Sequence, residues 1–403
     1  MKKFIFLILS LFSLLYIFSI SPLPGTEVYA EEKTVSGSAV NISSVSAVLL
    51  EGSTGEIIYE KDKDKELVPA SITKIMTLNL IFEALDSKKI TLEDKVTVSE
   101  YAASMGGSQV FLEPNETQTV NDMIKCISIA SANDAAVAMA EKIAGSEEAF
   151  VKKMNQKAKE LGMKHTHFQN CTGLDDDIKS GHYSSAYDVA LMSRELITKH
   201  PEISGYSTVW MDKITHKTKK GETEFGLTNT NKLVRFYDGI TGLKTGSTSK
   251  AKYCLSATAR RNDMDLIAVV MAAPDHKLRF SEAQSLLDYG FANCSLYKDT
   301  GILDVLEPVP VQGGTRDCVQ SEPSCVFSHV FTTEVDTKNI KRTLSFQENI
   351  KAPLKKGATI GKATYSYHNQ NIGSVDLIAS ESVEEAGFKD YLLGTVKKLF
   401  HKL

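Results

Sequence analysis

The sequence lacks any block of basic residues, and its 46 lysines and arginines are outnumbered by 50 acidic residues. With a net charge of −4 it does not carry the positive surface that nucleic-acid binding requires, so no nucleic-acid partner is expected. It also lacks Cys-x-x-Cys pairs and His-x3-5-His spacings. The short His165–His167 run is typical of a solvated turn, so the sequence predicts no metal and no cofactor.

Cysteines are few for a chain of this length, and six of them are not needed to hold a core of this size. Cys126 and Cys254 lie in apolar runs and are predicted to be buried thiols. Cys318 and Cys325 flank a short polar loop and are the best candidates for a disulfide. The pairing of the six thiols stays open from the sequence.

The first 30 residues differ from the rest of the chain. Lys2 and Lys3 precede an apolar run over residues 4–20, and the small residues Val28 and Ala30 fit a signal-peptidase site. We expect residues 1–30 to be a signal peptide that is cleaved after Ala30. An uncleaved anchor is the alternative, since the run is at the short limit of a membrane span. Either outcome places the remaining chain outside the cytoplasm.

The mature chain divides by composition. Residues 31–44 are polar and serine-rich and form a flexible lead-in. In residues 45–294, strands flank a largely helical middle, which predicts an α/β domain with an antiparallel sheet and a helical subdomain. Residues 295–382 contain short strand–turn units and form a small β-rich domain. Residues 383–403 show an apolar stripe beside lysines, as in a helix that lies on a membrane surface.

Ser71 and Lys74 stand three residues apart at the start of the apolar helix predicted over residues 68–85. On a helix such positions are neighbours, so the amine can reach the hydroxyl. A serine hydroxyl becomes a nucleophile only when a base removes its proton, and a lysine can be that base when burial keeps it neutral. An N-cap serine with a surface lysine is the structural alternative.

Two further elements add polar groups that a catalytic cleft needs. Ser131 and Asn133 lie in a short connection between helical runs at 120–130 and 135–144, and they can relay a proton and bind a carbonyl. Lys244, Thr245 and Thr248 enter a predicted strand and offer a carboxylate site. Gly246, between them, would let a substrate backbone lie close to that strand.

In the order S-x-x-K, S-x-N, K-T-G, these elements resemble the motif set of the penicillin-recognising serine enzymes. The chain resembles one branch in particular, the low-molecular-mass penicillin-binding proteins that are D-alanyl-D-alanine carboxypeptidases. The resemblance covers nearly the whole mature chain and includes "NCTGLDDD", "GHYSSAYDVALMSREL", "RFSEAQSLLDYGF" and the C-terminal "APLKKGATIGKATYSYHNQNIGSVDLIAS". It implies the β-lactamase/transpeptidase-like fold for the first domain.

The resemblance also implies roles for single residues. Ser71 would be the acylated nucleophile and Lys74 its base, while Ser131 and Lys244 would relay protons to the leaving D-alanine. Asn133 would contact the peptide amide. The backbone N–H groups of Ser71 and Ser247 would form the oxyanion hole. The terminal carboxylate would bind to Thr245, Thr248 and Arg279. The chain departs from the family pattern at Lys252 and Ala132, where glycine is common.

The implied function is removal of the terminal D-alanine from peptidoglycan stem peptides, with β-lactams as covalent inhibitors. The implied location is the outer face of the cytoplasmic membrane, reached through the C-terminal helix. A DD-endopeptidase acting on cross-links and a non-catalytic wall-binding protein remain alternatives. A serine β-lactamase is a weaker one, because no E-x-x-L-N segment lies between Ser131 and Lys244.

Overall fold

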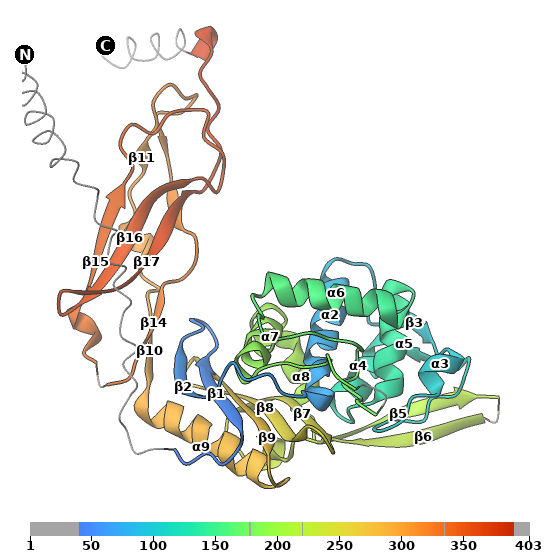
Figure 1. The fold of residues 1–403 in the computed structure, drawn as a ribbon. Coiled ribbons are helices and arrows are strands. Elements are labelled where there is room, and N and C mark those ends of the chain that lie inside the picture. The colour runs from blue at the N-terminus through green and yellow to red at the C-terminus, as the bar shows by residue number, and fades with distance from the viewer. Residues whose placement is uncertain (1–39, 177–178, 220, 334, 391–403) are drawn as a thin grey trace, which may run out of the picture. The chain divides into compact units, whose positions relative to one another are not determined.

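A computed structural model describes residues 40–176, 179–219, 221–333 and 335–390. Its first part is built on a five-stranded sheet with strand order β2-β1-β9-β8-β7, in which every neighbouring pair is antiparallel (Figure 1). The predicted α/β architecture is confirmed. The strands of this sheet are β1 (Ser46–Glu51), β2 (Ile57–Lys61), β7 (Ile240–Thr248), β8 (Lys252–Arg261) and β9 (Met264–Ala273).

Helices cover both faces of this sheet because its central strands are apolar on both sides. Val48 and Leu50 of β1 face the larger helical layer, while Ala47 and Leu49 face α9 (Leu278–Asn293). The larger layer contains α2 (Lys74–Asp86), α3 (Glu100–Ala103), α4 (Val120–Ser128), α5 (Asn133–Ala144), α6 (Glu147–Glu160), α7 (Ala186–Lys199) and α8 (Ser204–Ser207).

Short elements complete the first part of the chain. Strands β3 (Lys95–Thr97) and β4 (Thr117–Thr119) pair beside the helices, and a 3-10 turn, η1 (Ala70–Thr73), leads into α2. The long hairpin of β5 (Met211–Thr218) and β6 (Gly221–Thr228) was not predicted. Its exposed residues do not alternate cleanly with buried ones, so it shows no period-2 signal.

The C-terminal part is β-rich, as predicted, and has its own core. Its main sheet has the order β13-β17-β16-β15, and two smaller pairs, β10–β14 and β11–β12, lie outside that sheet. Tyr365 stacks on Phe327 with ring centroids 3.7 Å apart, and its hydroxyl donates to Asp299. The strands are β10 (Ser295–Lys298), β11 (Val309–Pro310), β12 (Cys318–Val319), β13 (Ser321–Pro323), β14 (Ser328–Phe331), β15 (Ile340–Phe346), β16 (Thr359–Tyr367) and β17 (Gln370–Ala379).

Two sequence expectations need correction. The terminal helix does not begin at Val383, because Val383 is buried in the β-rich core and bridges to Leu354; the described helical residues start at Phe388. Cys318 and Cys325 are both free and exposed, so they form no disulfide here. Cys126 and Cys254 are buried thiols, as predicted.

Some expectations lie outside the described residues. The apolar run at 4–20, the signal-peptide segment 1–30 and most of the C-terminal amphipathic segment are among them. Within the described part of the chain, no helix is long and apolar enough to cross a membrane.

Candidate active site

The predicted serine–lysine pair lies at the entry to α2. Ser71 belongs to η1 and is partly exposed, whereas Lys74, the first residue of α2, is completely buried. The Lys74 amine donates hydrogen bonds to Ser71 Oγ at 3.0 Å and to the Thr172 carbonyl at 2.8 Å. Burial lowers the pKa of Lys74 to about 7. A large fraction of this amine is therefore neutral near pH 7, as a proton acceptor must be.

The Thr172 carbonyl is held by a loop that follows α6. The side chain of Asn170 accepts from the Gly173 N–H at 2.7 Å and donates to the Leu174 carbonyl at 2.7 Å, which fixes the loop internally. Gly173 has a φ of +80°, and a Cβ there would lie 1.8 Å from the Ala70 carbonyl oxygen. Only glycine can pack this loop against the serine turn. The loop's backbone role was not predicted, since any residue type supplies a carbonyl.

The second predicted element forms the connection from α4 to α5. Ser131 is buried, has a φ of +61° and accepts a hydrogen bond from the Lys244 amine at 2.8 Å. Asn133 is the first residue of α5, and its Nδ2 donates to the Gly106 carbonyl at 2.7 Å. Among the described residues its Oδ1 has no partner although it is buried. This oxygen is free to accept an N–H from a ligand.

The third element lies on β7, an edge strand of the sheet. Lys244 is almost completely buried, and its pKa is lowered by burial first and then by the charges of Lys74 and Arg279. The Thr245 hydroxyl donates to the Thr230 hydroxyl at 2.7 Å. The sequence gave no indication that Thr230, a polar residue in a loop, would join the site.

Gly246 is required because the chain's own backbone packs against it, which the sequence analysis did not predict. A Cβ at this position would lie 2.7 Å from the Pro69 carbonyl oxygen and 3.1 Å from the Ile72 amide nitrogen. The backbone that approaches Gly246 is therefore the chain's own serine turn, not only a substrate. The missing side chain lets η1 and Ser71 lie directly against β7.

The groups expected to bind a carboxylate have different partners. Thr248 donates its hydroxyl proton to the buried Asp175 carboxylate at 2.7 Å, so this proton is already committed. Ser247 is exposed. Arg279 Nη1 donates to the Gly246 carbonyl at 3.1 Å, and its buried Nε has no partner among the described residues. Of the residues predicted to bind the carboxylate, Arg279 alone keeps a donor without a partner among the described residues, because the Thr245 hydroxyl also donates already, to Thr230.

The three sequence elements meet in one place. Ser71, Lys74, Ser131 and Lys244 form two amine–hydroxyl pairs, with Asn133 beside them. Such a group can activate a hydroxyl, receive its proton and return a proton to a leaving amine without a metal. Within the described residues, no cluster of His, Cys, Asp or Glu side chains is arranged to hold a metal ion.

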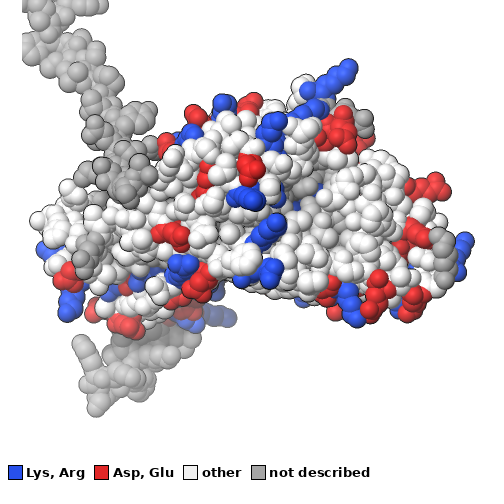
Figure 2. Space-filling model, turned by 90° about the horizontal axis from the view of Figure 1, so that it is seen from below, with Lys and Arg blue, Asp and Glu red and all other residues white. Residues whose placement is uncertain are grey.

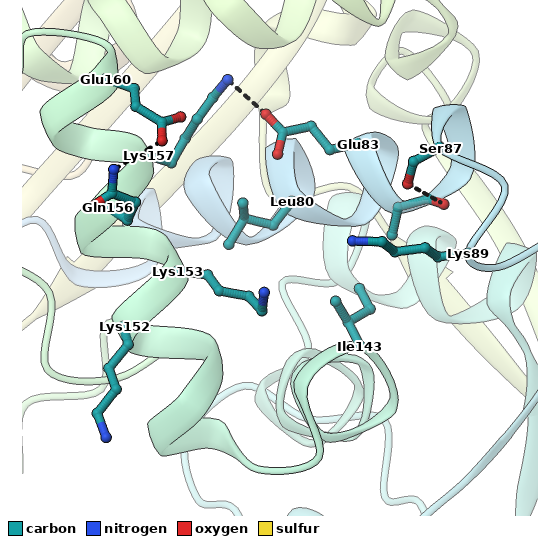
Figure 3. A pocket seen from close by; sticks show the side chains of 11 residues that line it. Leu80, Glu83, Ser87, Lys89, Ile143, Lys152, Lys153, Gln156, Lys157 and Glu160 are labelled. Atoms are coloured by element: carbon teal, nitrogen blue, oxygen red, sulfur yellow. Dashed lines mark hydrogen bonds and ion pairs between the residues drawn. The ribbon is translucent and has the colours of Figure 1, made fainter.

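A pocket of about 530 Å³ lies away from this site, between α2, α5 and α6 (Figure 3). Its walls include Leu80 and Ile143, with lysines around the rim, and it contains none of the motif residues. The motif residues are the better candidate site, because a hydroxyl there contacts a buried amine of lowered pKa. On the face seen in Figure 2, basic and acidic side chains are interspersed, with no extended area of one sign.

Comparisons with known proteins point to one family. Residues 31–275 match a family model described as D-alanyl-D-alanine carboxypeptidase (peptidase S11), and residues 298–385 match the C-terminal domain of penicillin-binding protein 5. D-alanyl-D-alanine carboxypeptidase DacF of Bacillus subtilis is 44% identical over 354 residues, which cover 87% of this chain and 88% of the relative.

Solved structures show the same likeness. Penicillin-binding protein 5 from Haemophilus influenzae superposes with a TM-score of 0.72 at 31% identity, covering 87% of this chain and 100% of the other. Penicillin-binding protein D2 from Listeria monocytogenes, in an ampicillin-bound form, has a TM-score of 0.53 at 32% identity. It covers 63% of this chain and 100% of its own.

Proposed function

The chain belongs to the D-alanyl-D-alanine carboxypeptidase family, and from this membership we propose how its own residues carry out the reaction. The protein is a serine-type carboxypeptidase that acts on peptidoglycan stem peptides ending in D-Ala-D-Ala. We assign the acyl-enzyme to Ser71. The observation that carries this assignment is the fully buried Lys74 amine, 3.0 Å from Ser71 Oγ with its pKa lowered to about 7.

In the first step, neutral Lys74 takes the proton of Ser71 while Oγ attacks the carbonyl carbon of the penultimate D-alanine. The oxyanion that forms is held by the backbone N–H groups of Ser71 and Ser247, the type of interaction that contributes most to such a transition state. The C–N bond then breaks as Ser131 gives its hydroxyl proton to the leaving amine, and the proton that Lys74 took from Ser71 returns to Ser131. Water hydrolyses the ester and restores Ser71.

Substrate binding divides between two sides of the cleft. Asn133 holds the peptide amide, which is consistent with its unpartnered buried Oδ1. Arg279 binds the terminal carboxylate. Thr245 and Thr248 can join it only if their hydroxyl protons leave Thr230 and Asp175, since those hydrogen bonds are already formed.

The assignment of Ser71 is tested by intact mass after β-lactam treatment. Wild-type protein should gain one adduct, and the modified peptide should contain Ser71. Ser71→Ala should gain none and should lose hydrolysis of a D-Ala-D-Ala peptide. An adduct retained by the Ser71→Ala protein would show that another residue is the nucleophile.

We also propose that the chain is exported and attached to the outer face of the cytoplasmic membrane. The support is the sequence pattern of residues 1–30 and of the terminal apolar stripe, which lie largely outside the described residues. Phe388, the first residue of that stripe in the described part, is 84% exposed and is therefore available for contact. The substrate is extracytoplasmic, which favours the same location.

Deleting residues 388–403 tests the attachment while keeping buried Val383 in the β-rich core. The truncated mature protein should be released from anionic vesicles and should still hydrolyse a soluble peptide. A milder change replaces Lys397, Lys398 and Lys402 by glutamine and keeps the apolar stripe. It should weaken vesicle binding, and the remaining binding should depend less on salt concentration. Binding that survives the deletion would show that the segment is not the anchor.

A further inference from the structure

Phe111 combines two unfavourable features at one position. Its side chain is 63% exposed, and its backbone has a φ of +62°. The left-handed region is strongly disfavoured for a bulky side chain, and strained residues cluster at functional sites. An exposed aromatic ring on a strained backbone indicates a functional role, because the ring does not contribute to core packing.

A buried carboxylate holds this conformation. The N–H groups of Val110 and Leu112, on either side of Phe111, both donate to Asp134 Oδ2 at 3.1 Å. Val110, Leu112 and Asp134 are all buried. Because both neighbours point inward, the ring of Phe111 is directed outward. Asp134 directly follows Asn133 on α5, so this support belongs to the same helix start as the substrate-binding amide.

A second ring lies against the first. Phe225, on β6, packs edge to face on Phe111 with centroids 5.9 Å apart. Phe225 also packs on His216 of β5, whose Nδ1 hydrogen-bonds to buried Glu116 at 2.8 Å. These contacts join the hairpin to the chain that follows Phe111. Both rings are therefore pre-positioned.

The aromatic pair lies close to the catalytic cleft. The Asn133 N–H donates to the Ser108 carbonyl at 2.7 Å, and a Cβ on Gly107 would lie 2.9 Å from Asn133 Nδ2. Phe111 lies three residues after Ser108 along the chain, a span of at most about 10 Å. A substrate that extends two or three residues beyond Asn133 can therefore reach the rings.

We propose that Phe111 and Phe225 form an aromatic subsite for an apolar group on the acyl side of the substrate, upstream of the scissile bond. In β-lactams the same subsite would take an aromatic acyl side chain. This inference rests on the proposed function and adds a determinant of specificity to it. Apolar contact with the exposed ring of Phe111 and the partly buried ring of Phe225 is favourable, and it requires no motion of the pair because the pair is already ordered.

Two penicillins with the same β-lactam nucleus can distinguish contact with the subsite from the acylation reaction. Benzylpenicillin carries an aromatic acyl group, and 6-aminopenicillanic acid carries none. Phe111→Ala and Phe225→Ala should each slow acylation by benzylpenicillin about 10-fold, as expected for lost apolar contact. Acylation by 6-aminopenicillanic acid should change less than twofold. Phe236→Ala is the matched control, because Phe236 is a 72% exposed phenylalanine outside this pair.

Peptides provide a second arm. A D-Ala-D-Ala substrate with an apolar residue two positions upstream should lose kcat/KM in both alanine variants, and its glycine counterpart should not. Should an alanine variant not fold, as judged by circular dichroism, Phe111→Leu and Phe225→Leu keep an apolar group while removing the ring. They should show a smaller, ligand-dependent loss.

The outcomes are distinguishable. Equal loss on both penicillins, or no loss on either, would overturn the subsite and leave the role of Ser71 standing. A wild-type protein that neither penicillin acylates would overturn the proposed function and this inference with it.

Discussion

The start of α2 and strand β7 each contribute one buried lysine to the site, and each lysine donates to a serine hydroxyl. Lys74 lies 3.0 Å from Ser71 Oγ, and Lys244 lies 2.8 Å from Ser131 Oγ. The residue types and the distances are nearly the same on the two sides. What differs is the set of charges around each amine.

Burial lowers the pKa of both amines, but their neighbours act in opposite directions. Cys171 and Asp134 raise the pKa of Lys74, which brings it back to about 7. Lys74 and Arg279 lower the pKa of Lys244 further. Lys74 can therefore gain and lose a proton near neutral pH, while on the strand side Arg279 supplies the positive charge and, with Lys74, lowers the pKa of Lys244. Neighbouring charges, not residue type, make the two amines differ.

The largest expected effect comes from exchanging each lysine for arginine. A guanidinium cannot lose its proton at working pH, so Lys74→Arg should lower the acylation rate by about 10²–10⁴-fold, the usual contribution of a general base. Lys244→Arg keeps a donor for Ser131 and should lose less. Stopped-flow acylation with a reporter cephalosporin compares the two. Similar losses in both variants would remove the distinction between the two sides.

Arg279, beside strand β7, should make the enzyme prefer substrates with a free terminal carboxylate. Replacing the terminal carboxylate of a D-Ala-D-Ala peptide by an amide should reduce transition-state binding by about 2–5 kcal/mol, since Arg279 is left without its partner. In Arg279→Ala, kcat/KM should become nearly equal for acid and amide. Arg279→Lys should recover part of the preference through its charge. Equal rates on acid and amide in the wild type would favour an endopeptidase-like site.

The pH dependence of the acylation rate should follow the protonation of Lys74, at the start of α2. Below pH 7 Lys74 becomes protonated and cannot accept the proton of Ser71, so the acylation rate should fall about tenfold per pH unit at low pH. The rate should level off above that pKa. Arg279→Ala should leave this inflection nearly in place, because Arg279 acts on Lys244 and not directly on Lys74. A rate that is flat from pH 5 to 8 would contradict a neutralisable Lys74.

The smallest expected effect lies where β7 turns into β8. Lys252 has a φ of +58°, a conformation that disfavours a side chain by about 1–2 kcal/mol. Lys252→Gly should therefore keep or slightly raise the free energy of unfolding in urea, with acylation unchanged. Ser249→Gly, in the same turn without a positive φ, should lower it slightly. A clear loss of stability in Lys252→Gly would mean that the lysine side chain holds the turn.

The sequence predicted the side chains of this site better than its backbone. The sequence identified four candidate side chains, because hydroxyl and amine residues at a set spacing form a pattern that can be recognised in a sequence. They are Ser71, Lys74, Ser131 and Lys244. The carbonyl of Thr172 was not, because every residue has one. The reason for Gly246 was also missed, since its close neighbour, η1, lies far away in the sequence.

The fold shows the same limit. Helices α2, α4 and α5 lie within or beside the predicted helical runs at 68–85, 120–130 and 135–144, which apolar periodicity indicated. The β5–β6 hairpin was not predicted because most of its residues are exposed on both faces. Phe111 lies between the apolar residues Val110 and Leu112, and only the carboxylate of Asp134, which binds the N–H groups of both, reveals why its ring is exposed.

The complete burial of Lys74 has a consequence for where protons can travel. Its amine contacts Ser71 and the Thr172 carbonyl and has no exposed surface. A proton taken from Ser71 therefore cannot be handed to a buffer molecule, and it stays within the protein until the leaving amine accepts it. At constant pH and ionic strength, the acylation rate should be independent of the concentration and basicity of the buffer.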